Sequence, residues 1–173
     1  YHMLGFRKPF GCFLRYFIVS SSVNRRLGCL LMAGPAKSIG IRDRWIGWSS
    51  KRCLQALPWI INNTRYLLFP WVQVEHLASH VLGLLARRVA TDWEARWGYR
   101  PVLMETFVDP AHYRGTCYRA AGWRLLGRTT GEGLQRRGRS YRTTPKLMFV
   151  RPLARDARAQ LRSGDLVTTT EHE

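Results

Sequence analysis

The stretch that decides the fold is Thr64–Pro110, TRYLLFPWVQVEHLASHVLGLLARRVATDWEARWGYRPVLMETFVDP. It opens on an apolar, aromatic run over Thr64–Val72, and it closes on a second apolar run over Arg100–Asp109. Between them, apolar residues recur at helical spacing on one face: Leu77, Val81, Leu84, Leu85 and Trp93. A strand–helix–strand crossover predicts a parallel pair at the centre of a sheet, and Pro70 predicts a bulge or a splay in the first strand.

The flanking segments predict the rest of the sheet. Gly11–Ser21 and Arg26–Gly34 are β-like runs joined by a short polar turn, which indicates an antiparallel hairpin. Residues 123–131 and 146–153 predict two further strands. Asp109 is a candidate cap for a helix that runs through Tyr118 to Gly122. The fold class is therefore α/β, with a mixed sheet, antiparallel edges and a central parallel unit.

These elements form one domain over residues 1–153, and the polar residues 154–173 are expected to be a loosely ordered tail. Because the sequence begins with Tyr1 rather than methionine, we expect an N-terminally truncated fragment of a longer protein.

The charge of the chain points to a polyanionic partner. It has 28 Lys and Arg but 11 Asp and Glu, a formal net charge of +17. Nucleic acid is the first expectation, anionic membrane or CoA phosphates come second, and a preference for arginine as a solubilising residue is the alternative. The candidate nucleic-acid contacts lie in one glycine-rich segment: Arg136, Arg137, Arg139, Arg142 and Lys146.

Other patterns carry little chemistry. The four cysteines lack metal-ligand spacing and three lie in apolar runs, which favours a reducing, cytoplasmic location. No apolar run is long enough to span a membrane, so no membrane partner is expected. His76 and His80 are four residues apart on one helix, but a third ligand is absent, so no metal is predicted.

The order of elements resembles that of the GNAT N-acetyltransferases. Members of that superfamily hold the CoA pyrophosphate at a helix N-terminus through an R/Q-x-x-G-x-G/A turn, where backbone N–H groups attract phosphate. The matching positions here are Gln73, His76 and Ala78, with histidine in place of the first glycine. The resemblance implies acetyl-CoA as a possible cofactor. The motif GTCYRAAGW would place Tyr118 as the acid that protonates the leaving thiolate, although such a tyrosine also packs in cores.

Glu105 lies in the middle of the apolar run VLMETFVD. A carboxylate there is costly unless it is paired or functional, because burial disfavours its charged form. It is either the general base of an enzyme or a salt-bridge partner for an arginine such as Arg65.

A longer resemblance covers Tyr1 to about Leu153. The motifs IGW, NNTRYLLFPWV, LASHVLGLLARR, GYRPVLMETFVDP and GTCYRAAGW are similar to those of the family that includes the Druantia anti-phage protein DruA. The resemblance implies phage defence or association with mobile elements in bacteria, and other defence-system proteins as possible partners. Two functions remain open: nucleic-acid engagement on a degenerate acyltransferase scaffold, or a GNAT-type N-acyltransferase. A remnant without activity is the third possibility.

Overall fold

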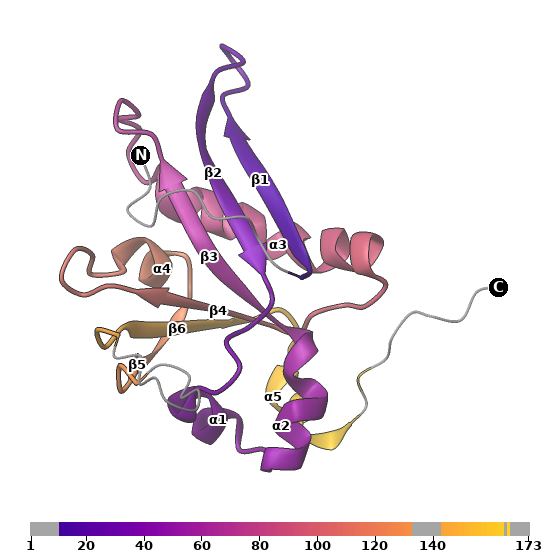
Figure 1. Cartoon of the computed structure of the whole chain (residues 1–173). Helices are drawn as coiled ribbons and strands as arrows, with labels where there is room; N and C mark the ends of the chain where they lie inside the picture. The colour runs from indigo at the N-terminus through magenta and orange to yellow at the C-terminus, as the bar shows by residue number, and fades with distance from the viewer. Residues whose placement is uncertain (1–10, 133–142, 165, 167–173) are drawn as a thin grey trace.

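A computed structural model describes residues 11–132, 143–164 and 166 (Figure 1). Its strands are β1 (Phe13–Val19), β2 (Arg26–Ala33), β3 (Ile60–Leu68), β4 (Leu103–Val108), β5 (Arg124–Arg128) and β6 (Leu147–Pro152). Its helices are α1 (Gly40–Ile46), α2 (Ser50–Ala56), the 3-10 turn η1 (Leu57–Trp59), α3 (Leu77–Trp97), α4 (Thr116–Ala120) and α5 (Ala157–Ser163).

The six strands form one sheet in the order β1-β2-β3-β4-β6-β5. β3 and β4 are parallel, and the other four neighbouring pairs are antiparallel. The mixed α/β sheet with a central parallel unit and antiparallel edges is therefore confirmed. The strand expected over Thr64–Val72 is β3, which spans Ile60–Leu68 and therefore lies earlier in the chain.

The sheet has a hydrophobic core on each face. On one face, α3 and α4 cover a cluster that includes Leu82, Trp93 and Phe149. On the other face, α1, α2 and α5 cover Ile46, Leu103 and neighbouring side chains. Figure 1 shows α3 behind β1–β3, with α1, α2 and α5 gathered at the opposite end of the sheet. Alternate side chains of β3–β6 therefore supply different cores, whereas the packed side chains of β1 and β2 belong to the first core.

Two local predictions are wrong. The tail predicted to be loosely ordered contains α5, whose Ala157 and Leu161 are buried in the second core. The helix predicted from Asp109 begins only at Thr116. Asp109 instead closes a turn, in which its carboxylate accepts a hydrogen bond from the N–H of Ala111 at 3.1 Å. In the described residues, no helix is long and apolar enough to cross a membrane.

Candidate functional site

The two parallel strands separate shortly after they begin. β3 and β4 pair only from Ile60 opposite Leu103 to Asn62 opposite Glu105. Just beyond, the register of β3 against β2 shifts, so that Thr64 is the extra residue of a bulge. Pro70 lies past the end of β3, so the prediction that this proline marks the splay is wrong.

Tyr118 fills the space where the strands separate. Its hydroxyl donates a hydrogen bond to Asn63 Oδ1 at 2.7 Å, and the hydroxyl of Thr106 donates to the carbonyl oxygen of Asn63 at 2.9 Å. The tyrosine is 7% exposed, and burial raises the pKa of its hydroxyl. This hydroxyl therefore ties α4 to both central strands. To act as an acid, it would first have to leave a buried hydrogen bond.

Glu105 faces the other side of the sheet. Its carboxylate accepts hydrogen bonds from Arg42 Nη1 at 2.9 Å and from the N–H of Ala36 at 2.8 Å. Both charged side chains are fully buried. Burial raises the pKa of Glu105, and the charge of Arg42 opposes that rise. The expected salt bridge exists, but its partner is Arg42 on α1 rather than Arg65.

The two candidate catalytic residues are thus not brought together. Thr106, next to Glu105 in β4, faces Tyr118 and the core beneath α3 and α4. Glu105 faces α1, because successive residues of a strand point to opposite faces. A single reacting group could not contact both the Tyr118 hydroxyl and the Glu105 carboxylate.

The positions matched to the CoA-binding turn lie at the start of α3. Gln73 is exposed in the preceding turn, His76 is the N-cap residue, and Ala78 is in the first helical turn. His76 has φ of +56°, the left-handed conformation that glycine adopts most easily. The backbone at residue 76 thus has a conformation that glycine favours, but the residue carries a Cβ and an imidazole. These residues therefore do not fit a pyrophosphate that needs close approach to the backbone.

The predicted basic segment is only partly described. Arg136, Arg137, Arg139 and Arg142 lie outside the described residues. Lys146 is described, and its ammonium group is held by the carboxylate of Asp109 and by Thr144 Oγ1, the latter at 2.7 Å. Lys146 is thus already paired with Asp109 and is not an open phosphate contact.

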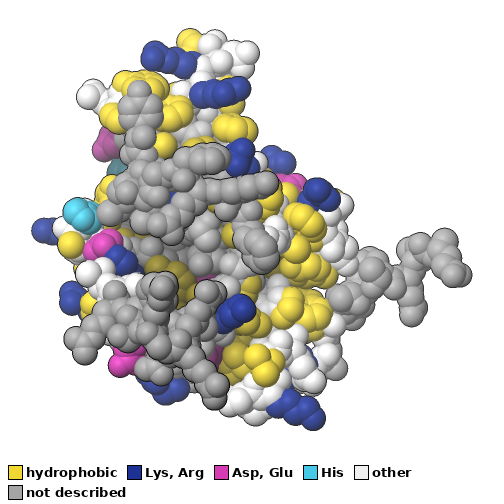
Figure 2. Space-filling model, viewed as in Figure 1, with side chains coloured by type: hydrophobic (Ala, Val, Ile, Leu, Met, Phe, Trp, Pro, Cys, Tyr) yellow, Lys and Arg dark blue, Asp and Glu magenta, His cyan; other side chains and the backbone are white. Residues whose placement is uncertain are grey.

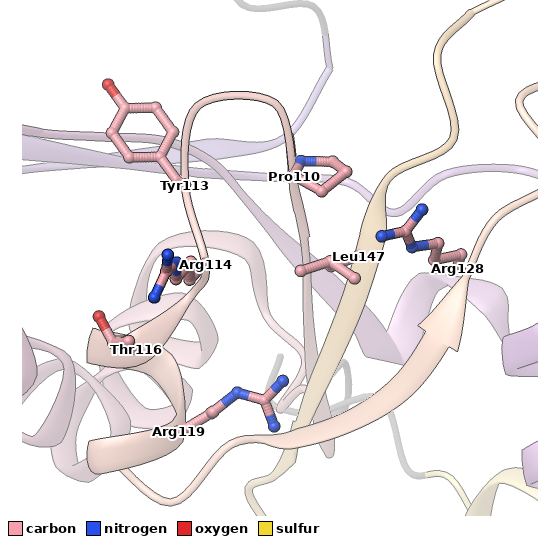
Figure 3. Close-up of a pocket in the computed structure, with 7 residues that line it drawn as sticks. All are labelled: Pro110, Tyr113, Arg114, Thr116, Arg119, Arg128 and Leu147. Atoms are coloured by element: carbon pink, nitrogen blue, oxygen red, sulfur yellow. The ribbon is translucent and has the colours of Figure 1, made fainter.

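A different set of arginines lines a cavity of about 430 Å³ beside α4 and the β5–β6 edge (Figure 3). Its lining consists of Pro110, Tyr113, Arg114, Thr116, Arg119, Arg128 and Leu147. Figure 3 shows Arg119 and Arg128 extending from α4 and β5 toward the space over Leu147, while the Tyr113 hydroxyl points away. We call this the arginine pocket.

A bulge in β5 brings Arg128 to the pocket. Arg124 lies opposite Val150 and Arg128 opposite Leu147, so one extra residue, Leu126, is inserted between them. In a regular strand, residues four apart share a face. The bulge reverses that relation and places Arg128 on the face that carries α4.

Packing also fixes the other side of the pocket. Gly115 has φ of +70°, and a Cβ there would lie 2.6 Å from the ring of Phe149, so only glycine fits. This close approach holds the backbone between Arg114 and Thr116 against Phe149. The Arg119 guanidinium lies 5.4 Å from the centroid of the same Phe149 ring. Cation–π contact therefore holds Arg119 without consuming its charge.

The pocket arginines have few internal partners. In the described ranges, no ion pair involves Arg114, Arg119 or Arg128. Sequence reasoning overlooked this set because its members are scattered over a loop, a helix and a strand. The available signal was the recurrence of arginine through RGTCYRAAGWRLLGR, residues 114–128. Among the described side chains, no three His, Cys, Asp or Glu are grouped as metal ligands.

Comparison with known proteins adds the family. The model of the family described as Druantia protein DruA matches residues 1–143. The chain belongs to the DruA family. The resemblance found in the sequence motifs is thereby confirmed, and this DruA-family membership suggests an anti-phage role. A search of curated proteins gives no match.

Two solved structures are similar to this DruA-family chain at low identity. One is a crystal structure described as a putative acetyltransferase from Sphaerobacter thermophilus DSM 20745, with 13% identity and a TM-score of 0.41 over 81% of this chain and 69% of that chain. The other is MesI, described as a CoA-dependent acyl-homoserine lactone synthase, with 14% identity and a TM-score of 0.41 over 87% and 68%.

Proposed function

We propose that this DruA-family protein engages nucleic acid through its basic surface, as part of an anti-phage or mobile-element-associated role. The observation that carries the proposal is that several of the described acidic side chains are already held by basic ones. Glu105 is buried against Arg42, and Asp92 and Asp109 are held by Arg88 and Lys146. Few carboxylates are left to neutralise the remaining cations.

The basic side chains outside those pairs are exposed on several elements. They include Arg44 on α1, Arg87 on α3, Arg119 on α4 and Arg128 on β5. Figure 2 shows Lys and Arg side chains distributed over the visible face, with fewer Asp and Glu among them. A surface with this excess of positive charge attracts phosphate backbones without regard to base sequence.

Arginine rather than lysine makes most of this surface, which suits phosphate recognition. A guanidinium is planar, always charged, and presents paired N–H donors that match phosphate oxygens. The acyltransferase alternative gains no support from Tyr118 and Glu105, because these residues face opposite sides of the sheet.

An electrophoretic mobility-shift assay tests the proposal with DNA and RNA, each in single-stranded and double-stranded form. Polyglutamate serves as a competitor that carries negative charge without phosphate. We expect retention of at least one nucleic acid at low salt, with polyglutamate competing poorly. Absence of any shift at low salt, or complete displacement by equal charge of polyglutamate, would refute nucleic-acid recognition.

A further inference from the structure

We infer that the arginine pocket binds a terminal phosphate group, the phosphomonoester at the end of a nucleic-acid strand or of a free nucleotide. This inference deepens the proposed function and rests on it for the choice of ligand. The pocket differs from the rest of the basic surface because three arginines line one cavity.

Charge favours phosphate over a weaker anion. Arg114, Arg119 and Arg128 contribute three positive charges to the cavity lining, and no carboxylate belongs to that lining in the described part of the chain. Asp109 is adjacent in sequence to the lining residue Pro110, but Lys146 already holds its carboxylate. A carboxylate ligand would neutralise one charge. A phosphomonoester carries close to two negative charges at neutral pH and three acceptor oxygens, as phosphorylated side chains do.

The geometry favours a strand end over the interior of a strand. The cavity is bounded on one side by the turn that contains Arg114 and on another by α4 and β5, which carry Arg119 and Arg128. A terminal phosphate offers three acceptor oxygens and close to two negative charges to the three arginines of this lining. An internal phosphodiester has only two such oxygens and a single charge, so it would leave part of this donor set unused.

Packing and strand geometry hold parts of the pocket in place before any ligand binds. Phe149 lies on β6, is fully buried, and supports both sides of the site: it excludes a Cβ at residue 115, and its ring lies beside the Arg119 guanidinium. Arg128 is placed by the β5 bulge rather than by a flexible loop. Side chains held in place before binding lose less conformational entropy when the ligand arrives.

The test compares short single-stranded oligonucleotides that carry a phosphate at the 5′ end, at the 3′ end, or at neither end. Binding is measured by fluorescence anisotropy, with adenosine monophosphate and inorganic phosphate as free competitors. We expect one phosphorylated end to bind roughly tenfold more tightly than the unphosphorylated strand, since charge-assisted hydrogen bonds are strong. That preference should disappear in R114Q/R119Q/R128Q.

The matched control is R44Q/R87Q/R155Q, which removes the same charge from exposed arginines outside the pocket. It should weaken all three oligonucleotides about equally and keep the preference for the phosphorylated end. Circular dichroism verifies that both variants are folded.

The outcomes separate this inference from the proposed function. If all three oligonucleotides bind equally and pocket substitution has no selective effect, the phosphate-end inference is wrong while nucleic-acid binding stands. If no oligonucleotide binds but adenosine monophosphate or phosphate binds and is lost in the pocket variant, the site stands and the proposed function is wrong. If neither class of ligand binds, both are wrong.

Discussion

The substitution Arg42→Met tests the assignment of Glu105 to a buried ion pair instead of a reaction. Arg42 Nη1 donates to Glu105 at 2.9 Å and to the carbonyl oxygen of Ala36 at 2.7 Å, and its Nε donates to Asp43 at 3.0 Å. Methionine removes these bonds and leaves the Glu105 carboxylate buried, with the Ala36 N–H as its one remaining donor among the described residues.

The expected loss in the free energy of unfolding is about 3–5 kcal/mol, the usual cost of leaving one member of a buried pair uncompensated. That is a large part of the ~5–15 kcal/mol that stabilises a typical domain. Urea denaturation followed by fluorescence of the seven tryptophans measures the loss. The double variant R42M/E105M should be more stable than R42M, because it removes the stranded charge as well.

The pH dependence provides a second readout. In R42M, the pKa of Glu105 should rise further above its ordinary value of 4.5, because burial no longer meets an opposing cation. An acid whose pKa is raised in the folded state destabilises that state progressively above its unfolded pKa, and fully above the raised pKa. The difference in the free energy of unfolding between wild type and R42M should therefore become smaller as the pH falls toward 4.5. A loss below about 1 kcal/mol, as at exposed pairs, would refute a buried charge pair. A double variant no more stable than R42M would contradict the coupling.

Three further predictions concern the point where β3 and β4 separate, the arginine pocket, and the ion pair between Arg88 and Asp92. Tyr118→Phe should cost about 1–3 kcal/mol, because it leaves the buried Asn63 Oδ1 without its donor; urea denaturation measures it, and an unchanged midpoint would count against the network. Gly115→Ala should cost about 1–3 kcal/mol through its positive φ and its contact with Phe149, and it should weaken binding of phosphorylated oligonucleotides; wild-type stability and binding would contradict both. The pKa of Asp92 is lowered, mainly by its hydrogen bond with Arg88. The stability that this pair contributes is therefore present above the ordinary pKa of 3.8, and it is lost as the pH falls through the lower pKa of the folded state. Asp92→Asn should remove that acid-dependent change, and an identical pH profile would refute it.

The sheet could be predicted largely from the sequence because hydrophobic period and turn residues are local signals. The strand–helix–strand unit, the first hairpin and the last strand follow from such signals. α5 was missed because its apolar face consists of little more than Ala157 and Leu161 among charged residues. Its stability comes from packing on the second core, which no local pattern reveals.

The candidate site was harder to predict because its residues meet only in three dimensions. The sequence identified Tyr118 and Glu105 as unusual, and both are indeed buried and hydrogen-bonded. It could not show that they face opposite sides of the sheet, since that depends on the packing of α4 and α1. Arg128 reaches the pocket only through a one-residue bulge, whose position no pattern of apolar residues specifies.

The salt dependence of nucleic-acid affinity tests the central claim most directly. Fluorescence anisotropy with an oligonucleotide over a series of salt concentrations gives the slope of log affinity against log salt, which reports how many phosphates the protein neutralises. We expect a steep negative slope for the wild type and a shallower one for R114Q/R119Q/R128Q. Affinity that is independent of salt, or absent at low salt, would contradict the account of this protein as a nucleic-acid-binding member of the DruA family.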